Sequence, residues 1–384
     1  MTALFDRFAP IFERIRANAA THERDRTLPH DEVRALAEAG FGALRLERDV
    51  SLAAFFELLV HLGAADSNLP QIWRNHIAFV EDRLQPEPAE QNGHWRKVIA
   101  SGAVVGGAWS ERGTTFDNPN TVLSDGRLTG TKYYSTGSIF ADWISVAAKR
   151  GDEHVIALVD ATAPGVAVVD DWAGIGQRTT GSGTARFTDV AVDEAGVFPF
   201  LQRAPYQEAV YQLVHLATLA GTARAARRDL VEAVRSRTRA YKHGLGETAR
   251  EDPQVLAVVG RVAALAYAAE AAVLTAARSL DVVADAAIAG EDDLAPRLHE
   301  ATIVVYEAQG AVTELVLQAT TLLYDALSSS ALDAGTQLDR HWRNARTITS
   351  HNPRIYKERI VGDWHVNAAP PNLGFDRLTA PGSP

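Results

Sequence analysis

The sequence contains no cysteine, and its single methionine is Met1. Disulfides, thiolate nucleophiles, cysteine-ligated zinc and iron–sulfur clusters are therefore excluded. Positive charge is also in deficit, because 38 Lys and Arg stand against 48 Asp and Glu and give a formal net charge of −10. Such a chain lacks the basic surface that non-specific nucleic-acid binding requires, so we expect no nucleic-acid partner.

Long uncharged apolar runs are missing as well. The most apolar stretch, from Val262 to Val283, is interrupted by Glu270 and by two other charged residues, so it does not predict a membrane span. The N-terminal segment mixes charged residues into every turn and lacks the apolar core of a secretory signal. We therefore expect a cytoplasmic protein with no membrane partner.

The first and last parts of the chain show helical spacing of apolar residues. The first helical block ends at the turn signal Pro86-Glu87-Pro88, and a short helix is expected over Ala89 to Ser101. From Tyr206 to Ser350 the helical pattern breaks only near residues 244–253, 290–296 and 328–335. This spacing predicts four long helices, which is typical of a bundle.

Between the helical blocks, the chain alternates short β-rich runs with Gly, Asp, Asn and Ser. Tight hairpin turns are expected at Ser124–Arg127 and Arg150–Glu153. Strands are expected at Ala103–Val105, Thr121–Leu123, Trp143–Ala148, His154–Val159, Val166–Val169 and Thr184–Phe187. Turns at this spacing are typical of a small barrel or sandwich.

Helices, then strands, then helices predict an α+β fold. We expect an N-terminal helical domain at residues 1–101, a central β domain at 102–200, and a C-terminal helical bundle with its tail at 201–384.

No pattern in the sequence predicts a metal or dinucleotide site. The glycine-rich run from Gly174 to Gly181 lacks the helix that must follow a phosphate-binding loop, so we interpret it as a loop between two strands. Glu300, Glu307 and Glu314 share a helix face, but the Glu-x-x-His partner of a di-iron bundle is absent from the bundle helices. We interpret this face as solvated or salt-bridged. The twelve histidines show no paired ligand spacing.

His351 lies just beyond the last helical pattern, which should stop at Asn352 because Pro353 disfavours helical geometry there. A helix C-terminus stabilises an imidazolium. We therefore expect His351 to be protonated near neutral pH and able to donate a proton. The alternative is a capping residue without chemistry.

Four motifs, in order along the chain, resemble the acyl-CoA dehydrogenase superfamily. They are Trp109-Ser110-Glu111, Gly130 to Ser138, Gly174 to Thr184, and Asp339 to Ala345. Each is weak alone, but together they cover the β region and helical regions at the family's spacing. The resemblance implies that superfamily's fold, with an N-terminal helical domain, a central β-barrel or sandwich and a C-terminal four-helix bundle.

The sequence departs from the dehydrogenases at their catalytic base. There, a glutamate after the Arg-Asp-Ala helix removes the α-proton of an acyl thioester. Here that position holds Asn352, which cannot act as a base at any pH. Some members place the glutamate early in the first bundle helix, where this sequence has His215.

The segment from Arg340 to Asn367 and the pair Asn75-His76 look more like the flavin-dependent monooxygenases of this fold, of the dibenzothiophene monooxygenase group. This resemblance implies reduced FMN from a separate NAD(P)H-dependent flavin reductase, O2 as co-substrate, and a homotetramer. The stretch from Thr238 to Gly244 is a degenerate form of the Arg-x-x-Phe-Gly run that holds the adenosine half of FAD. This favours FMN, with FAD as the alternative.

The implied reaction is addition of O2 to reduced flavin at C4a and transfer of oxygen from the (hydro)peroxyflavin to a small apolar or heteroatom substrate, at sulfur, nitrogen or an aromatic carbon. The candidates for catalysis are His351, Asn352, Ser138 and His76. Those for cofactor binding are Ser110, Thr136, Ser182, Arg239 and Arg346, the arginines because phosphate needs a cationic fork. Those for an apolar substrate pocket are Trp73, Tyr134 and Trp143.

Three functions remain open. The first is the flavin monooxygenase, in which N-hydroxylation of an amine or amino sugar competes with oxygenation of an organosulfur compound. The second is an FAD-dependent acyl-CoA dehydrogenase with a relocated base. The third is a non-catalytic scaffold that binds no flavin.

Overall fold

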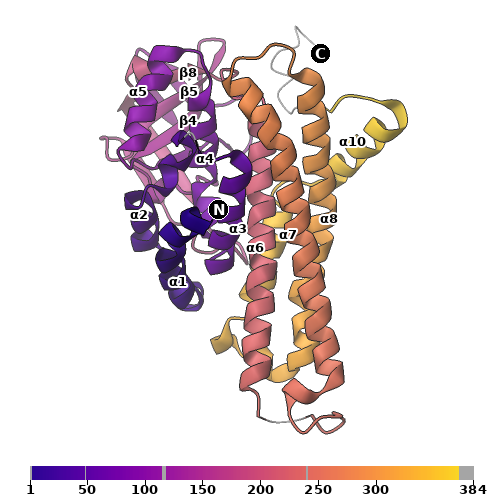
Figure 1. Cartoon of the computed structure of the whole chain (residues 1–384). Helices are drawn as coiled ribbons and strands as arrows, with labels where there is room; N and C mark the ends of the chain where they lie inside the picture. Colours follow the sequence, from indigo (N-terminus) through magenta and orange to yellow (C-terminus); the bar gives the residue numbers. More distant parts are fainter. Residues whose placement is uncertain (1, 48, 115–117, 239–240, 372–384) are drawn as a thin grey trace.

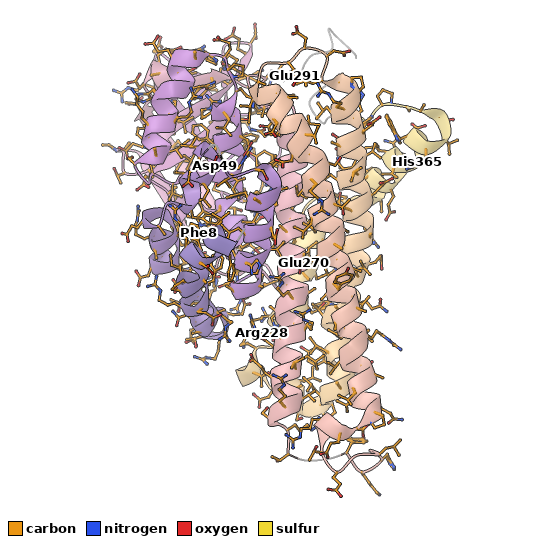
Figure 2. The ribbon with its side chains drawn as sticks, viewed as in Figure 1. Phe8, Asp49, Arg228, Glu270, Glu291 and His365 are labelled. Atoms are coloured by element: carbon orange, nitrogen blue, oxygen red, sulfur yellow. The ribbon has the colours of Figure 1, made fainter. Side chains whose placement is uncertain are left out.

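The computed structural model describes residues 2–47, 49–114, 118–238 and 241–371. Its first part is helical, as the apolar spacing predicted. The helices are α1 (Thr2–Asp25), α2 (His30–Glu38), α3 (Leu52–Ala65), α4 (Leu69–Leu84) and α5 (Ala89–Ala100), with a 3-10 turn, η1 (Phe41–Leu46). Apolar side chains of α1 to α4 contribute to one core, in which Phe8 of α1 is fully buried (Figure 2). Those of α5, Trp95 and Ile99, pack in a second cluster with side chains of the sheet.

In the described residues, eight strands form one sheet in the order β6-β7-β3-β2-β4-β5-β8, and β1 pairs in parallel with β4. The strands are β1 (Val105–Ala108), β2 (Val122–Ser124), β3 (Arg127–Lys132), β4 (Trp143–Arg150), β5 (Glu153–Asp160), β6 (Val166–Val169), β7 (Thr184–Ala191) and β8 (Val197–Pro199). The two predicted hairpin turns are confirmed, with Ser124 opposite Arg127 and Arg150 opposite Glu153. Strands β3 and β8 were not predicted.

The C-terminal part consists of α6 (Gln207–Ser236), α7 (Pro253–Ile288), α8 (Ala295–Leu327), α9 (Arg340–Thr349) and α10 (Arg354–Asn367). Figure 1 shows α6, α7 and α8 side by side, with α6 toward the N-terminal helices and α10 on the opposite side. The prediction of four long helices is wrong in its last member, because α9 has only 10 residues. Helix α10 after Pro353 was not predicted.

Two of the three glutamates on one face of α8, Glu307 and Glu314, contact basic side chains of α10. The carboxylate of Glu314 pairs with Arg354, and Oε1 of Glu307 lies 2.7 Å from Nε2 of His365 on α10 (Figure 2). This face therefore holds α10 against α8.

Helix α7 is long and apolar enough, by length and composition, to cross a membrane, and it is the one helix of the described chain that passes this test. Only 17% of its most apolar stretch is buried within the chain, and Tyr267 and Val282 are largely exposed. A helix that packs against another protein surface has the same composition. The domain division at residues 101 and 200 stays a prediction.

Candidate functional site

A cavity of about 900 Å³ lies where α4, α6 and the residues after α9 meet loops of the sheet. Its volume is near the upper end of the roughly 300–1,000 Å³ that small-molecule sites occupy. Seven of the predicted site residues line it: Ser110, Tyr134, Thr136, Ser182, Arg346, His351 and Asn352. The cavity is therefore the candidate active site.

Helix α9, which contains most of the Asp339 to Ala345 motif, holds the glycine-rich loop that borders the cavity. The backbone N–H of Gln177 donates to Oδ1 of Asn344 at 2.6 Å, and Nη1 of Arg343 donates to the carbonyl of Ile175 at 3.0 Å. A Cβ on Gly176 would lie 2.2 Å from the carbonyl oxygen of Arg343, so only glycine fits there. The loop joins β6 to β7, which confirms the predicted loop between two strands.

A chain of hydroxyl groups on the sheet side of the cavity has a carbonyl acceptor at each end. The Thr136 end lies 3.4 Å from the carbonyl of Tyr134, and the shorter bond at the Thr180 end favours one donor direction. Thr180 donates to the carbonyl of Gln177 at 2.8 Å, so its oxygen accepts the proton of Ser182, 2.7 Å away. Ser182 in turn accepts from Thr136, whose oxygen lies at 2.6 Å. The Thr136 proton is thus used within the protein, and its oxygen offers lone pairs to a ligand.

A second hydrogen-bond chain fixes the tautomer of His351. The amide nitrogen of Asn352 donates to Oε1 of Gln212 at 2.9 Å, which leaves Oδ1 of Asn352 as an acceptor 3.1 Å from Nδ1 of His351. Nδ1 therefore carries the proton, and Nε2 is the unprotonated nitrogen.

His351 is open to the cavity, yet desolvation by its surroundings and the positive charge of Arg74 lower its pKa to about 4. The expectation of a protonated ring near neutral pH is therefore wrong, because these two effects outweigh the helix C-terminus. The ring packs against His215, with centroids 4.4 Å apart. His215 is buried, neither ring nitrogen has a partner within the described chain, and burial holds its pKa well below the usual value.

Two predicted catalytic residues lie in the core instead. Nδ1 of His76 accepts the backbone N–H of Val105 at 3.1 Å, and Nε2 donates to the carbonyl of Gly42 at 3.0 Å. The hydroxyl of Ser138 donates to the carbonyl of Gly107 at 3.1 Å, and the side chain is buried. Neither residue lines the cavity, so the catalytic roles expected for them are wrong.

Of the predicted pocket tryptophans, Trp73 is a core residue, and Trp143 is partly buried against the core. Trp73 is fully buried, edge-on to Phe41 at 5.2 Å, and Trp143 lies edge-on to Trp95 at 5.1 Å. Neither lines the cavity. Tyr134 does, and its ring meets Trp172 edge-on at 6.0 Å. Arg239 lies outside the described residues.

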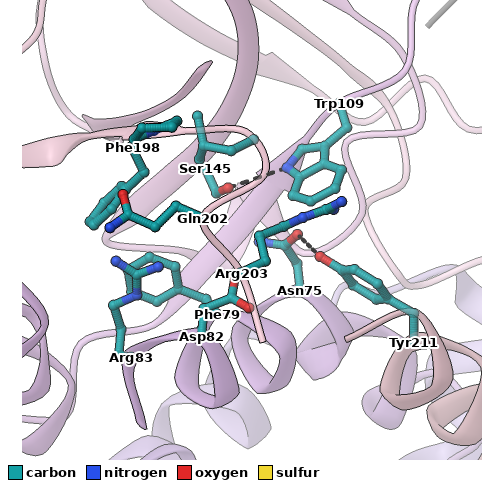
Figure 3. A pocket seen from close by; sticks show the side chains of 12 residues that line it. Asn75, Phe79, Asp82, Arg83, Trp109, Ser145, Phe198, Gln202, Arg203 and Tyr211 are labelled. Atoms are coloured by element: carbon teal, nitrogen blue, oxygen red, sulfur yellow. Dashed lines mark hydrogen bonds between the residues drawn. The ribbon is translucent and has the colours of Figure 1, made fainter. Parts of the chain in front are cut away.

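Several cavity residues were missed by the sequence reasoning. They are Gln71, Arg74, Trp109, Trp172, Glu208 and Tyr211. Figure 3 shows how two of them are held: the indole N–H of Trp109 donates to Oγ of Ser145 at 3.2 Å, and the Tyr211 hydroxyl donates to Oδ1 of Asn75 at 3.1 Å. Asn75-His76 was the available signal for α4, but it did not reveal which side chains face the cavity.

Comparison with known proteins confirms the resemblance. A family model described as the acyl-CoA dehydrogenase C-terminal domain matches residues 213–353. A dibenzothiophene monooxygenase of Rhodococcus erythropolis is 26% identical over 353 residues, covering 83% of this chain and 81% of that protein. A probable FMNH2-dependent monooxygenase, SfnC, of Pseudomonas putida is 26% identical over 337 residues, covering 83% and 82%.

Solved structures of the same fold extend over nearly the whole chain. FMN-bound TdsC from Paenibacillus sp. A11-2 is 27% identical with a TM-score of 0.86, covering 96% of this chain and 98% of that one. The methanesulfinate monooxygenase MsuC from Pseudomonas fluorescens is 25% identical with a TM-score of 0.85 and the same coverage. The chain therefore has the acyl-CoA dehydrogenase-like fold, which it shares with these monooxygenases.

Proposed function

We propose that this chain is the oxygenase of a two-component flavin monooxygenase, which takes reduced FMN from a separate NAD(P)H-dependent reductase and uses O2 to oxygenate a small organosulfur compound. Relatives that match most of the chain are named as FMNH2-dependent or dibenzothiophene monooxygenases, and one solved neighbour is a methanesulfinate monooxygenase. We further propose a cytoplasmic location.

The observation that carries the proposal is that the Thr136 hydroxyl donates its proton within the protein, to Ser182 at 2.6 Å or to the carbonyl of Tyr134 at 3.4 Å. Because Thr136 acts as an acceptor, it suits a ligand that presents an N–H group. Position N5 of a flavin carries a hydrogen only in the reduced form. The cavity residues therefore fit reduced FMN, with Ser110 as a second polar contact and Arg346 as the partner of the phosphate.

Reduced FMN, when bound, supplies the electrons that activate O2. His351, neutral and unprotonated at Nε2, would accept a hydrogen bond or a proton from the reacting group. Tyr134 and Trp172 supply aromatic surface to the cavity, where an apolar substrate would pack.

Glu208 favours a second candidate, the acyl-CoA dehydrogenase with FAD. Its carboxylate lines the cavity, and burial raises its pKa, as is typical of a general base. Loss of the yellow colour of bound FAD on addition of an acyl-CoA, abolished in Glu208→Gln, would support this function. An unchanged flavin spectrum would exclude it.

The decisive experiment mixes the protein with anaerobically reduced FMN, admits O2, and measures oxygenated product and hydrogen peroxide. Arms with an aryl sulfide, an alkanesulfinate and an amine separate organosulfur oxygenation from N-hydroxylation. We expect an organosulfur arm to give oxygenated product and correspondingly less hydrogen peroxide than a sample without substrate. Stoichiometric peroxide with no product in all arms would contradict the proposal, and a protein that binds no flavin would indicate a scaffold.

We also propose a homotetramer in which α7 packs against another copy. Leu256, Tyr267 and Val282 of α7 are 48%, 74% and 60% exposed, which is unusual for large apolar side chains on one helix. Light scattering should give four times the 41.5 kDa chain mass. Tyr267→Glu should lower that mass, and a monomeric wild type would contradict the proposal.

A further inference from the structure

The charges around the cavity are unequal. Of the described residues that line it, Arg74 and Arg346 are the cationic ones and Glu208 carries the single carboxylate. His351 is neutral near pH 7, since its pKa is about 4. One arginine matches the phosphate of FMN under the proposed function, and the other has no assigned partner.

Arg74 is held by one edge of its guanidinium. Nε donates to the backbone carbonyl of Tyr211 at 3.1 Å, and the guanidinium carbon lies 4.3 Å from the centre of the Tyr211 ring. The two terminal nitrogens, Nη1 and Nη2, donate to no described residue, and no described carboxylate lies within 4.0 Å of them. They form a two-pronged donor beside the cavity.

Desolvation of this half-buried charge is only partly offset by the charge of Glu208. Desolvation lowers the pKa of Arg74 to about 10, so the group stays cationic at neutral pH. Glu208 forms no ion pair with it among the described residues. Burial raises the pKa of that carboxyl, and Lys357 and Arg203 favour its ionised form more than Arg74 does. A desolvated cation without an ion-pair partner at a cavity wall is suited to bind an anion.

The surroundings of Arg74 hold it in place. The Tyr211 hydroxyl donates to Oδ1 of Asn75 at 3.1 Å, and Nδ2 of Asn75 donates to the carbonyl of Gly106 at 2.7 Å (Figure 3). Trp109 meets the Tyr211 ring edge-on at 5.8 Å. The guanidinium thus rests on a ring that is itself anchored, which lowers the entropy cost of binding a planar or trigonal anion.

We propose that Arg74 is the anion subsite of the cavity and binds the sulfinate, sulfonate or carboxylate group of a small organic substrate. The inference deepens the proposed function, on which it rests for the fate of the bound molecule. Because Arg74 and His351 line one cavity, the anion is bound within the chamber where Nε2 of His351 is available.

The test compares two probes of similar shape and different charge. Benzenesulfonate is anionic, and methyl phenyl sulfone is neutral; neither needs to react. Calorimetric titration of the wild type, with and without saturating oxidised FMN, should show benzenesulfonate binding about 10- to 100-fold more tightly. Equal or tighter binding of the sulfone would overturn the subsite, and this comparison requires no variant.

Variants then locate the charge. Arg74→Met should reduce the affinity for benzenesulfonate about 10-fold or more and leave the sulfone unchanged, while Arg74→Lys should retain part of the preference. Arg14→Met, at an exposed position of α1, is the matched control and should change neither. Unchanged sulfonate binding in Arg74→Met would refute the assignment.

The competing anion is the phosphate of FMN. Titration of Arg74→Met with FMN and with riboflavin separates the two sources, because only FMN carries phosphate. A loss confined to FMN would assign Arg74 to the cofactor and overturn the proposal. Sulfonate binding by a wild type that binds no flavin would leave the subsite standing and contradict the proposed function instead.

Discussion

Replacing Asn352 by aspartate tests the hydrogen-bond chain that sets the protonation of His351. In the wild type, Oδ1 of Asn352 is a neutral acceptor 3.1 Å from Nδ1 of His351, and Gln212 fixes the orientation of the amide. Asn352→Asp puts a negative charge at the same place with little change of shape. It should therefore stabilise the imidazolium and raise the pKa of His351.

The size of the rise follows from the distance. Unit charges 3.1 Å apart interact by about 5 kcal/mol at an effective dielectric constant of about 20, equivalent to roughly 4 pKa units. Solvent in the open cavity screens part of this interaction energy, and desolvation of the new carboxylate opposes its ionisation. We expect a net rise of about 1 to 3 units, from about 4 to between roughly 5 and 7.

The assay is an NMR titration of protein labelled with 13C-histidine, in which His351→Gln identifies the resonance. The matched control is Gln212→Glu, which places the same charge one hydrogen bond farther from the ring and should produce a smaller rise. An unchanged pKa in Asn352→Asp, or an equal rise in the control, would refute the chain of contacts described above.

Three further predictions concern other parts of the structure. Lys132→Met removes the cation 2.7 Å from Glu111, and both side chains are nearly inaccessible to solvent. The variant should lose about 3–5 kcal/mol of unfolding free energy, measured by urea denaturation. Adding Glu111→Gln to it should restore part of the lost stability, because no unpaired carboxylate is then buried. The pKa of His76 is about 4 in the folded protein, against 6.5 for a free histidine. Below pH 6.5 the unfolded chain takes up a proton that the folded protein does not, so the unfolding free energy falls as pH decreases. Between about pH 7.5 and pH 5.5 the wild type should lose roughly 1.3 kcal/mol more than His76→Ala, and parallel pH profiles would contradict this. Ser182→Ala removes the 2.6 Å acceptor of the Thr136 proton and leaves the weaker contact with the carbonyl of Tyr134 at 3.4 Å. It should therefore tighten the binding of oxidised FMN and weaken that of reduced FMN by about threefold to tenfold in fluorescence titrations. Equal changes in both forms would contradict the donor role of Thr136.

Strands β3 and β8 were not predicted because their local sequences do not favour a strand. Tertiary contacts nevertheless hold these residues in the sheet. Strand β3 contains Gly130, which weakens a strand signal, yet a Cβ there would lie 2.2 Å from Oγ1 of Thr121. The glycine is thus required by a close neighbour that only the fold provides. Strand β8 has three residues, ends in Pro199, and pairs with β5 at the sheet edge. The hairpin turns were predictable because their geometry depends on adjacent residues alone.

The site was predictable where a family motif includes the cavity residues, as for Thr136, Ser182 and His351. On α4 it was not, since successive residues of a helix differ by about 100°. Arg74 and Asn75 therefore face the cavity, whereas Trp73 and His76 on either side face the core. The sequence identifies the segment but not which of its four neighbouring side chains meet a ligand.

The charge on Arg74 links the proposed anion subsite to the protonation of His351. After desolvation, that charge is the largest influence holding down the pKa of His351, and it acts in the same direction on His215. An anion bound to Arg74 cancels this influence, so the pKa of His351 rises when the substrate is bound. Nε2 then attracts a proton more strongly in the complex than in the free protein. Nε2 of His351 would therefore accept a proton more readily when an anionic substrate occupies Arg74 than when the site is empty. Proton transfer to His351 would in this way depend on substrate binding.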